Sequence, residues 1–263
     1  MKPTSSRAAR RLSKKAAAGG PPTLAALDAR ITRAKIKGLT TPLEDRAKRI
    51  LRSYLQTAQT YGMPVTDVIA EMGNGEASRR LGAAVRDEIL KTPPDAVRKA
   101  ACSDGCAFCC ILSGGEGGLI TQAEAKTLHT ALSPLQGQPD GRAWHKNACP
   151  ALDPETQSCR VYDARPMICR SFLSTDAEAC RQNAEGGTEQ GAGLLGSHLD
   201  YLAVHALCRQ VLKGITQVHS YSLAAVAAGA VAGDDAETSL ANARHKPSAL
   251  DTACRDGANA ASA

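Results

Sequence analysis

The segment CSDGCAFCC at residues 102–110 constrains this chain more than any other, because it places four cysteines within nine positions. These cysteines follow a spacing of i, i+4, i+7 and i+8. On a helix that spacing confines the four side chains to an arc of about 100°. In a loop, Gly105 would permit a tight turn that also brings them together. Either backbone therefore places four thiols on one side of the chain.

A second group of cysteines follows at positions 149, 159, 169 and 180. Thiolates held close together repel one another unless a cation lies among them, and a metal ion supplies that charge and lowers the pKa of the thiols that bind it. Cysteine also serves as a small buried apolar residue, which would explain one or two positions but not eight. Clustered cysteines in a reducing compartment indicate metal binding or catalysis. We therefore predict eight metal ligands: Cys102, Cys106, Cys109, Cys110, Cys149, Cys159, Cys169 and Cys180.

The spacing leaves zinc and an iron–sulfur cluster as alternatives. Zinc takes four Cys or His ligands and commonly uses C-x-x-C pairs. An iron–sulfur cluster also takes four thiolates, and soft sulfur ligands suit both. Eight cysteines would fill two such sites, or one site with four left over. A redox dithiol at CAFC, residues 106–109, is the main chemical alternative, although no strand leads into it as in a thioredoxin-like site.

Together, the two cysteine blocks resemble a family of zinc- or iron-chelating domains with a CxxxCxxCC cluster, the YkgJ-type cysteine cluster proteins. The first block is CSDGCAFCC, and the second is CPALDPETQSCRVYDARPMICRSF at 149–172, followed by Cys180. The segment GLITQAEAKTL at 118–128 also resembles the hydrophobic–Thr–acid stretch of the family. The resemblance covers roughly residues 99–185. The matching positions of the second block are Cys149-Pro150, Cys159, Val161-Tyr162, Arg165-Pro166, Cys169-Arg170 and Phe172.

The resemblance implies metal chelation without a defined activity, because most members of the family have none assigned. Flagellin lysine methylases carry a related cysteine motif. The alternative to a metal-binding protein is therefore a cluster-dependent enzyme with redox or lysine-methylase-like chemistry. That alternative requires a cofactor motif, and GGEGG at 114–118 does not qualify, because it neither follows a clear strand nor opens a helix at once. The sequence leaves open whether the chain is an enzyme.

The residues between the last cysteines carry local structural signals. Pro166 disfavours helix at Arg165, which predicts extended or turn backbone over 159–165. Pro166 can then begin a short helix that bears Cys169. The sequence therefore predicts a loop followed by a helical turn at this ligand.

Two arginines and two aromatic residues lie beside the predicted ligands. Arg165 and Arg170 would donate N–H groups to sulfur and offset its negative charge, as partners outside the ligand shell commonly do. The alternative for each is an ion pair with an aspartate at the surface. Tyr162 and Phe172 are expected to pack around the site and shield it from water.

Histidines near cysteines are a further source of ligands. His145 precedes Cys149 by four residues and His205 precedes Cys208 by three, and both spacings could place a ligand pair on one helical face. We expect surface or core histidines instead, because eight cysteines suffice for two sites. Because Cys208 lies in an apolar helix, we predict that it is buried in the core. We interpret Cys254 as incidental.

Aromatic residues make up only 3% of the chain against 43% apolar residues, so the core must rest on Leu, Ile, Val and Ala. That composition favours helices. We predict a mainly α fold, with a small helical N-terminal bundle, an irregular, metal-stapled cysteine-rich central domain, and C-terminal helices. The expected segments are a disordered basic tail (1–22), the helical N-terminal region (23–98), the cysteine-cluster domain (99–185), the C-terminal helices (186–232) and a polar, flexible tail (233–263).

Apolar periodicity and capping residues predict the helices of the N-terminal region. Thr23 is the expected cap of a first helix that runs to Gly38. TPLE at 41–44 predicts a second helix with Thr41 as the cap and Glu44 as its capping-box partner.

Later helices follow from the same signals. Gly62 and Pro64 should end the second helix, and a third should cover 77–91. Its expected buried face comprises Leu81, Val85, Ile89 and Leu90. A further helix is expected over 121–132, and two more within 197–232.

Charge bears on partners and location. The net charge is +6, and residues 1–15 alone carry six basic residues and no acid. A basic tail can contact nucleic acid, but a short tail without aromatics is typical of a solvated segment. The roughly neutral cysteine segment argues against a nucleic-acid adaptor. No apolar region follows the basic start, and the longest apolar run, at 223–232, is far shorter than the roughly 20 residues of a membrane span. We expect a cytoplasmic protein whose partner is a metal ion and which does not bind a membrane.

Overall fold

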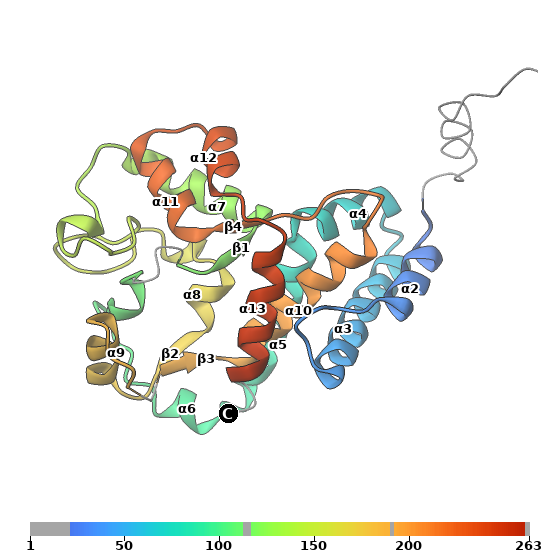
Figure 1. Cartoon of the computed structure of the whole chain (residues 1–263), viewed down its shortest axis with the longest axis horizontal. Helices are drawn as coiled ribbons and strands as arrows, with labels where there is room; N and C mark the ends of the chain where they lie inside the picture. Colours follow the sequence, from blue (N-terminus) through green and yellow to red (C-terminus); the bar gives the residue numbers. More distant parts are fainter. Residues whose placement is uncertain (1–21, 113–116, 190–191, 261–263) are drawn as a thin grey trace, which may run out of the picture.

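The chain folds largely into helices in a computed structural model (Figure 1). The structure describes residues 22–112, 117–189 and 192–260, so nearly all of the predicted basic tail and most of the GGEGG segment lie outside it. Helices predominate over short strands in the described ranges, which confirms the prediction of a mainly α fold. No helix in these ranges combines the length and the apolar character that crossing a membrane would need.

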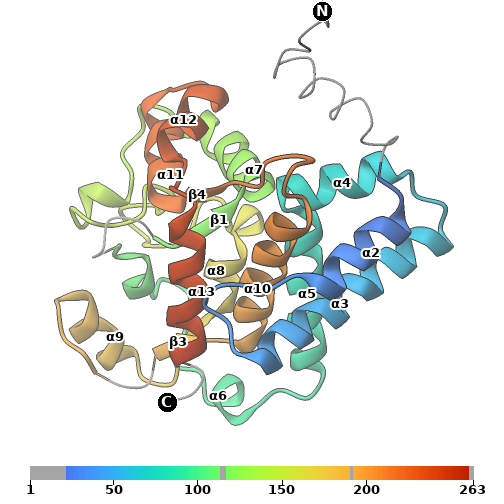
Figure 2. The same cartoon turned by 45° about the vertical axis from the view of Figure 1, so that its right-hand side comes forward.

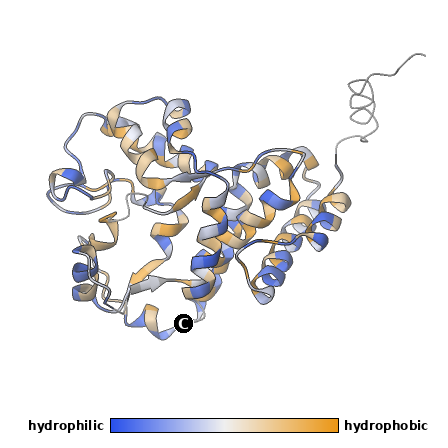
Figure 3. Ribbon diagram, in the orientation of Figure 1, coloured by the Kyte–Doolittle hydropathy of each residue, from blue (hydrophilic) through white to orange (hydrophobic). Residues whose placement is uncertain are grey.

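Six helices, which we call the helical body, fill one side of the molecule (Figures 1 and 2). They are α2 (Leu24–Arg33), α3 (Thr41–Thr60), α4 (Val65–Asn74), α5 (Glu76–Lys91), α10 (Gly196–Val211) and α13 (Ser248–Ala260). α10 contacts all of the other five, and its main partners are α5, α3 and α13. Most residues of α10 are buried. Figure 3 shows both hydrophilic and hydrophobic residues along α2 and α3, as expected of helices with one buried face.

The connection between α2 and α3 departs from the sequence prediction. Thr23 caps α2 as predicted, because its Oγ1 accepts from the Ala26 N–H at 3.2 Å. α2 ends well before Gly38, and the Ile36 N–H donates to the Glu44 carboxylate at 2.9 Å instead of continuing the helix. The predicted capping box at Thr41 and Glu44 is therefore wrong, because Thr40 is the N-cap residue of α3 and makes no side-chain cap bond.

The α4–α5 hairpin also differs from the prediction. α4 is absent from the sequence prediction, although Val65, Val68, Ile69 and Met72 have helical spacing. α5 matches the predicted third helix, but its buried residues are Ala77, Ser78 and Gly82. The predicted face is only half-buried, because α10 packs closely against the small residues instead. That face comprises Leu81, Val85, Ile89 and Leu90.

Residues 233–260 form two helices where the sequence suggests a flexible tail. These are α12 (Ala236–Ala243) and α13. Leu250, Cys254 and Ala258 recur every four residues along α13 and are buried in the helical body. Cys254, interpreted from the sequence as incidental, is therefore a core residue, and Cys208 in α10 is fully buried as predicted.

A second apolar cluster lies beside the helical body. It is built from α7 (Gln122–Leu132), α11 (Leu223–Ala232) and α12, together with side chains of the cysteine segment. Thr121 and Glu124 form a capping box at the start of α7. The strand β1 (Leu119–Thr121) pairs antiparallel with β4 (Ser220–Ser222), with Ile120 opposite Tyr221. The helices predicted over 121–132 and within 197–232 are thus present, as α7, α10 and α11.

Apart from α7, the described part of residues 95–189 contains only short elements joined by loops. Its strand β2 (Phe172–Ser174) pairs antiparallel with β3 (Ala192–Leu194). Its other helices are α6 (Asp95–Arg98), η1 (Phe108–Cys110), η2 (Ser133–Leu135), η3 (Gly141–Ala143), η4 (Tyr162–Ala164), α8 (Met167–Ser171) and α9 (Ala177–Ala184). Much of the segment therefore lacks the repeated backbone hydrogen bonds of long helices.

Candidate metal centre

All eight cysteines that the sequence predicts as ligands line one cavity. We call it the thiol cavity, and its volume is about 680 Å³. The thiols come from the loop at 102–110, the loop at 149–159, α8 and α9. The structure thus brings together residues that are up to 78 positions apart in the sequence (180 − 102). Their role as ligands stays a prediction.

The first cysteine block is mainly a loop rather than a helix. Gly105 has a φ of +76°, in the left-handed region that favours glycine. The Cys106 N–H donates to the Ser103 carbonyl at 3.1 Å across this turn. Only the last residues form a helical turn, η1. Of the two backbones consistent with the spacing, the glycine turn is the one observed.

Cys102 is tied to the strand β2. The Ser174 N–H points at Cys102 Sγ at 3.4 Å, and the neighbouring Ala101 N–H donates to the Ser174 carbonyl at 2.8 Å. β2 leads into α9, which Asp176 caps by accepting from two N–H groups at its start. Cys180 lies on α9, so the connection from β2 to α9 places Cys180 on the same cavity as the first cysteine block.

The second cysteine block packs against the end of the first. The Cys149 N–H donates to the Cys110 carbonyl at 2.8 Å, and Leu152 bridges to Cys159. Pro166 ends the loop and precedes α8, which carries Cys169, as predicted from the proline. These contacts place three loops around one space.

Burial sets the protonation of most of these thiols. Burial raises the pKa of Cys149 to about 12 and also raises the pKa values of Cys106, Cys159 and Cys169. The thiol of Cys110 donates a hydrogen bond to Cys109, which lowers the pKa of Cys109 to about 7. Buried thiols are thus neutral at pH 7 unless a cation lies among them, and a coordinating metal ion would displace their protons.

The donor chemistry fits zinc or iron. Sulfur is the ligand atom of tetrahedral zinc sites and of iron–sulfur clusters. Among residues 22–112, 117–189 and 192–260, no three His, Cys, Asp or Glu side chains are arranged so that they could hold one ion. Ligation therefore requires the thiols around the cavity to turn toward a shared point.

Arg165 is the cation next to the thiols. Its guanidinium lines the thiol cavity and lies 3.4 Å from the centroid of the Tyr162 ring. The hydrogen bond from Cys110 is the main cause of the lowered pKa of Cys109, and burial opposes it. The positive charge of Arg165 is a smaller cause that also lowers this pKa. Arg170 instead donates to the Arg165 carbonyl at 2.7 Å and is not among the residues that line the cavity. The sequence hypothesis of a charge beside the sulfurs thus agrees with the position of Arg165 alone.

The aromatic residues and histidines differ in their relation to the cavity. Phe172 and Tyr162 both line it, but Tyr162 is 59% exposed and shields it only partly. His205 is fully buried in α10 and its Nε2 lies 3.2 Å from the His219 carbonyl oxygen. Neither His205 nor His145 lines the thiol cavity, as expected for histidines outside the ligand set.

Glu124 is a buried carboxylate that sequence reasoning did not single out. Four hydrogen-bond donors set the position of its side chain. One oxygen accepts from the Met167 N–H at 2.8 Å, and the other accepts from the Thr121 N–H at 2.9 Å and the Thr121 hydroxyl at 3.0 Å. The Tyr201 hydroxyl also donates to it. Glu124 therefore joins α7, the start of α8 and α10, and the signal in the sequence is the T-x-x-E capping box.

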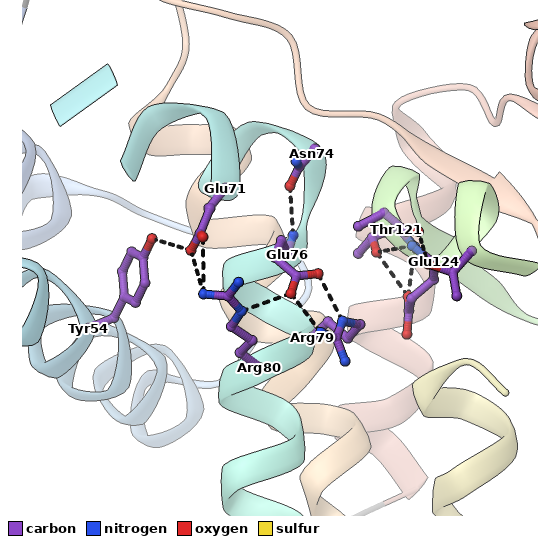
Figure 4. A network of polar contacts seen from close by, with 10 residues as sticks. Tyr54, Glu71, Asn74, Glu76, Arg79, Arg80, Thr121 and Glu124 are labelled. Atoms are coloured by element: carbon purple, nitrogen blue, oxygen red, sulfur yellow. Dashed lines mark hydrogen bonds and ion pairs between the residues drawn. The ribbon is translucent and has the colours of Figure 1, made fainter. Parts of the chain in front are cut away.

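A polar network on the helical body leads toward Glu124 (Figure 4). Glu71 accepts from the Tyr54 hydroxyl at 2.8 Å and pairs with Arg80, which also pairs with Glu76 at 2.8 Å. Arg79 binds Glu76 with two nitrogens, at 2.6 and 2.9 Å. A second cavity, of about 550 Å³, lies between this network, α7 and α8, and Arg165 lines both cavities.

Residues 101–189 match the model of a protein family described as "CxxCxxCC: Putative zinc- or iron-chelating domain". The match confirms the family resemblance of the two cysteine blocks and supports metal binding by this segment. It extends through α9 and ends before β3, so the helical body, α11 and α12 lie outside it. No curated protein and no solved structure matches the chain.

Proposed function

We propose that this chain is a metal-binding protein whose thiol cavity holds zinc or an iron–sulfur cluster. The single observation that carries the proposal is that eight cysteines from two sequence blocks line one cavity. The family match to a zinc- or iron-chelating domain supports it. The proposed ligands are Cys102, Cys106, Cys109, Cys110, Cys149, Cys159, Cys169 and Cys180.

The cavity favours metal binding over a simple redox dithiol. The C-x-x-C pair at 106–109 would account for two thiols, but six others line the same space. Arg165, a basic residue that lines the cavity, would offset part of the charge of bound thiolates. Eight thiols around one cavity can share bound cations, whereas one disulfide would use only two of the eight.

Metal binding would also stabilise the cysteine segment. Its loops contain short helices and isolated β-bridges rather than long elements. Metal–thiolate bonds would join these loops, so binding and folding of the segment would be coupled. We take residues 99–185 as the metal-binding unit on this basis.

The test is the metal and acid-labile sulfide content of the full chain after anaerobic purification, with a visible absorption spectrum. Stoichiometric zinc in colourless protein would identify a zinc protein. Iron with sulfide and a brown colour would identify a cluster and favour the alternative of a redox or lysine-methylase-like enzyme.

Matched variants make the test specific. Cys109→Ser should lose metal and lower the melting temperature, because one ligand of the cavity is removed. Cys208→Ala changes a buried cysteine outside the cavity and should keep the full metal content. Absence of zinc and iron from the purified protein, or equal metal content in both variants, would contradict the proposal.

A further inference from the structure

We propose that the thiol cavity contains two adjoining four-cysteine metal sites that differ in access to water. The inner site comprises Cys110, Cys149, Cys159 and Cys169. The outer site comprises Cys102, Cys106, Cys109 and Cys180. The inner site holds a divalent thiophilic ion, zinc or ferrous iron, as a lasting part of the fold, whereas the ion of the outer site exchanges with solvent. This division rests on the proposed function.

Apolar packing separates the same two groups. Cys149 belongs to the apolar cluster of α7, α11 and α12, and the other three inner cysteines pack against that cluster. Within the described part of the chain, none of the four outer cysteines belongs to or packs against either apolar cluster. The inner thiols are thus attached to a hydrophobic core, and the outer thiols are not.

A backbone hydrogen bond connects two of the inner cysteines directly. Cys149 donates to the carbonyl of Cys110, and the residues next to each, Ala148 and Ile111, form a β-bridge. Cys159 is bridged to Leu152 on the same loop. Three of the four inner cysteines, Cys110, Cys149 and Cys159, therefore lie on a small paired scaffold.

The outer cysteines lie on a separate support. Cys102 is held by Ser174 of β2, and Cys180 lies on α9, which packs against η1. Figures 1 and 2 show α9 apart from the helical body and from the group of α7, α11 and α12. The outer site is thus formed between the loop at 102–109 and one peripheral helix.

The two sites adjoin in the first cysteine block. Cys109 of the outer site and Cys110 of the inner site are neighbours in η1, so the boundary between the sites lies in this helical turn.

Exposure gives the two sites different exchange behaviour. Cys102 and Cys109 of the outer site are exposed, whereas no inner cysteine is, and Cys180 closes the outer site on its buried side. An ion in the inner site is shielded from water and from competing ligands, while one in the outer site is open to both. Each divalent ion binds by displacing protons from the thiols to solvent, with no change in oxidation state.

The experiment uses the full chain, stripped of metal and reloaded with zinc under anaerobic, reducing conditions. We expect two zinc ions per chain, and an excess of a colorimetric chelator should remove one at least tenfold faster than the other. Cys106→Ser and Cys180→Ser should each lose the fast zinc and keep the slow one. Cys159→Ser should lose the slow zinc and lower the melting temperature, and Cys208→Ala should match the unmodified chain.

The outcomes separate this division from the proposed function. Zinc that leaves the unmodified chain in a single phase, or loss of both ions from Cys106→Ser, overturns the division and leaves a metal-binding protein with one shared site. A chain that binds no zinc overturns both. If Cys159→Ser does not fold, the two outer-site variants still decide, because each must retain one slowly released zinc ion.

Discussion

Glu124 connects the candidate metal centre to the helical body through one buried carboxylate. It accepts from the N–H at the start of α8, which carries Cys169, and from the hydroxyl of Tyr201 in α10. Its side chain is almost fully buried, at 3% exposure of the residue. Because only an acceptor can satisfy these donors together, this side chain helps to hold the start of α8 in place.

Glu124→Gln should therefore loosen the metal centre while preserving side-chain size. Its amide NH₂ must face at least one of the donors that the carboxylate accepts, which leaves a buried N–H or O–H without a partner. That loss costs about 1–3 kcal/mol, and displacement of α8 should weaken metal binding by about 10–100-fold. Chemical denaturation and zinc competition with a chelator measure the two effects.

Glu178→Gln is the matched control. Glu178 lies on α9 near Cys180, but its carboxylate is exposed and pairs with Arg181 at the surface. Exposed ion pairs contribute little to stability, so this variant should unfold and bind zinc as the unmodified chain does. Equal zinc affinity in Glu124→Gln and Glu178→Gln would refute the positioning role of Glu124.

At the scale of helices, the contact of α5 with α10 depends on a glycine. A Cβ atom at Gly82 would lie 2.8 Å from the Cβ of Tyr201 and 3.4 Å from the Met167 Cε. The Tyr201 Cβ lies at the root of its side chain, so no rotamer change can relieve the first contact. The two helices can pack this closely only without a side chain at position 82.

Gly82→Ala should destabilise the chain, although alanine favours helix by about 1 kcal/mol. Separation of α5 from α10 should outweigh that gain, with a net loss of about 1–3 kcal/mol in the free energy of unfolding. Gly196→Ala, at the start of α10, meets no atom within 4 Å and should be neutral or stabilising by up to about 1 kcal/mol. A Gly82→Ala variant at least as stable as the unmodified chain in thermal and chemical unfolding would show that the close packing is not limiting.

Element prediction succeeded where local signals were strong. Thr23 and Pro166 fixed the starts of α2 and α8 through capping and backbone restriction. α13 was missed because its exposed face is polar, although Leu250, Cys254 and Ala258 have helical spacing. α5 was predicted with the wrong face, because the close approach of α10 to Gly82 is a tertiary contact that apolar periodicity does not record.

For the molecule as a whole, the cysteines were predictable from the sequence but their surroundings were not. Their number and spacing indicated a shared site, and the structure places all eight on one cavity. The supporting contacts join distant segments: β1 pairs with β4, and Glu124 meets Tyr201, 77 residues away. Such pairings leave no local pattern in the sequence, so the connection between the metal centre and the helical body emerged only from the fold.

Two buried histidines of α10 should make the whole molecule sensitive to acid. His198 and His205 flank Tyr201, with ring centroids 5.6 and 6.5 Å from its ring. Burial lowers the pKa of each to about 4, from 6.5. The Nδ1 atoms of both lack a hydrogen-bond partner among the described residues, so a proton there would be poorly solvated.

The sign of the effect follows from where each state binds protons. Between pH 6.5 and 4 the unfolded chain protonates both histidines while the folded chain keeps them neutral, so the free energy of unfolding falls as the pH falls. The stabilisation is complete above about pH 7 and decreases toward pH 4, by up to about 3 kcal/mol for each histidine. Urea unfolding of the full chain at several pH values measures this slope. The double variant His198→Gln with His205→Gln should have a flatter slope. A loss of packing in the variant would lower its free energy of unfolding at pH 8 as well and would leave this comparison of slopes valid. The double variant removes both imidazoles but keeps the carboxylates. An unchanged slope in that variant would therefore mean that other groups cause the acid sensitivity.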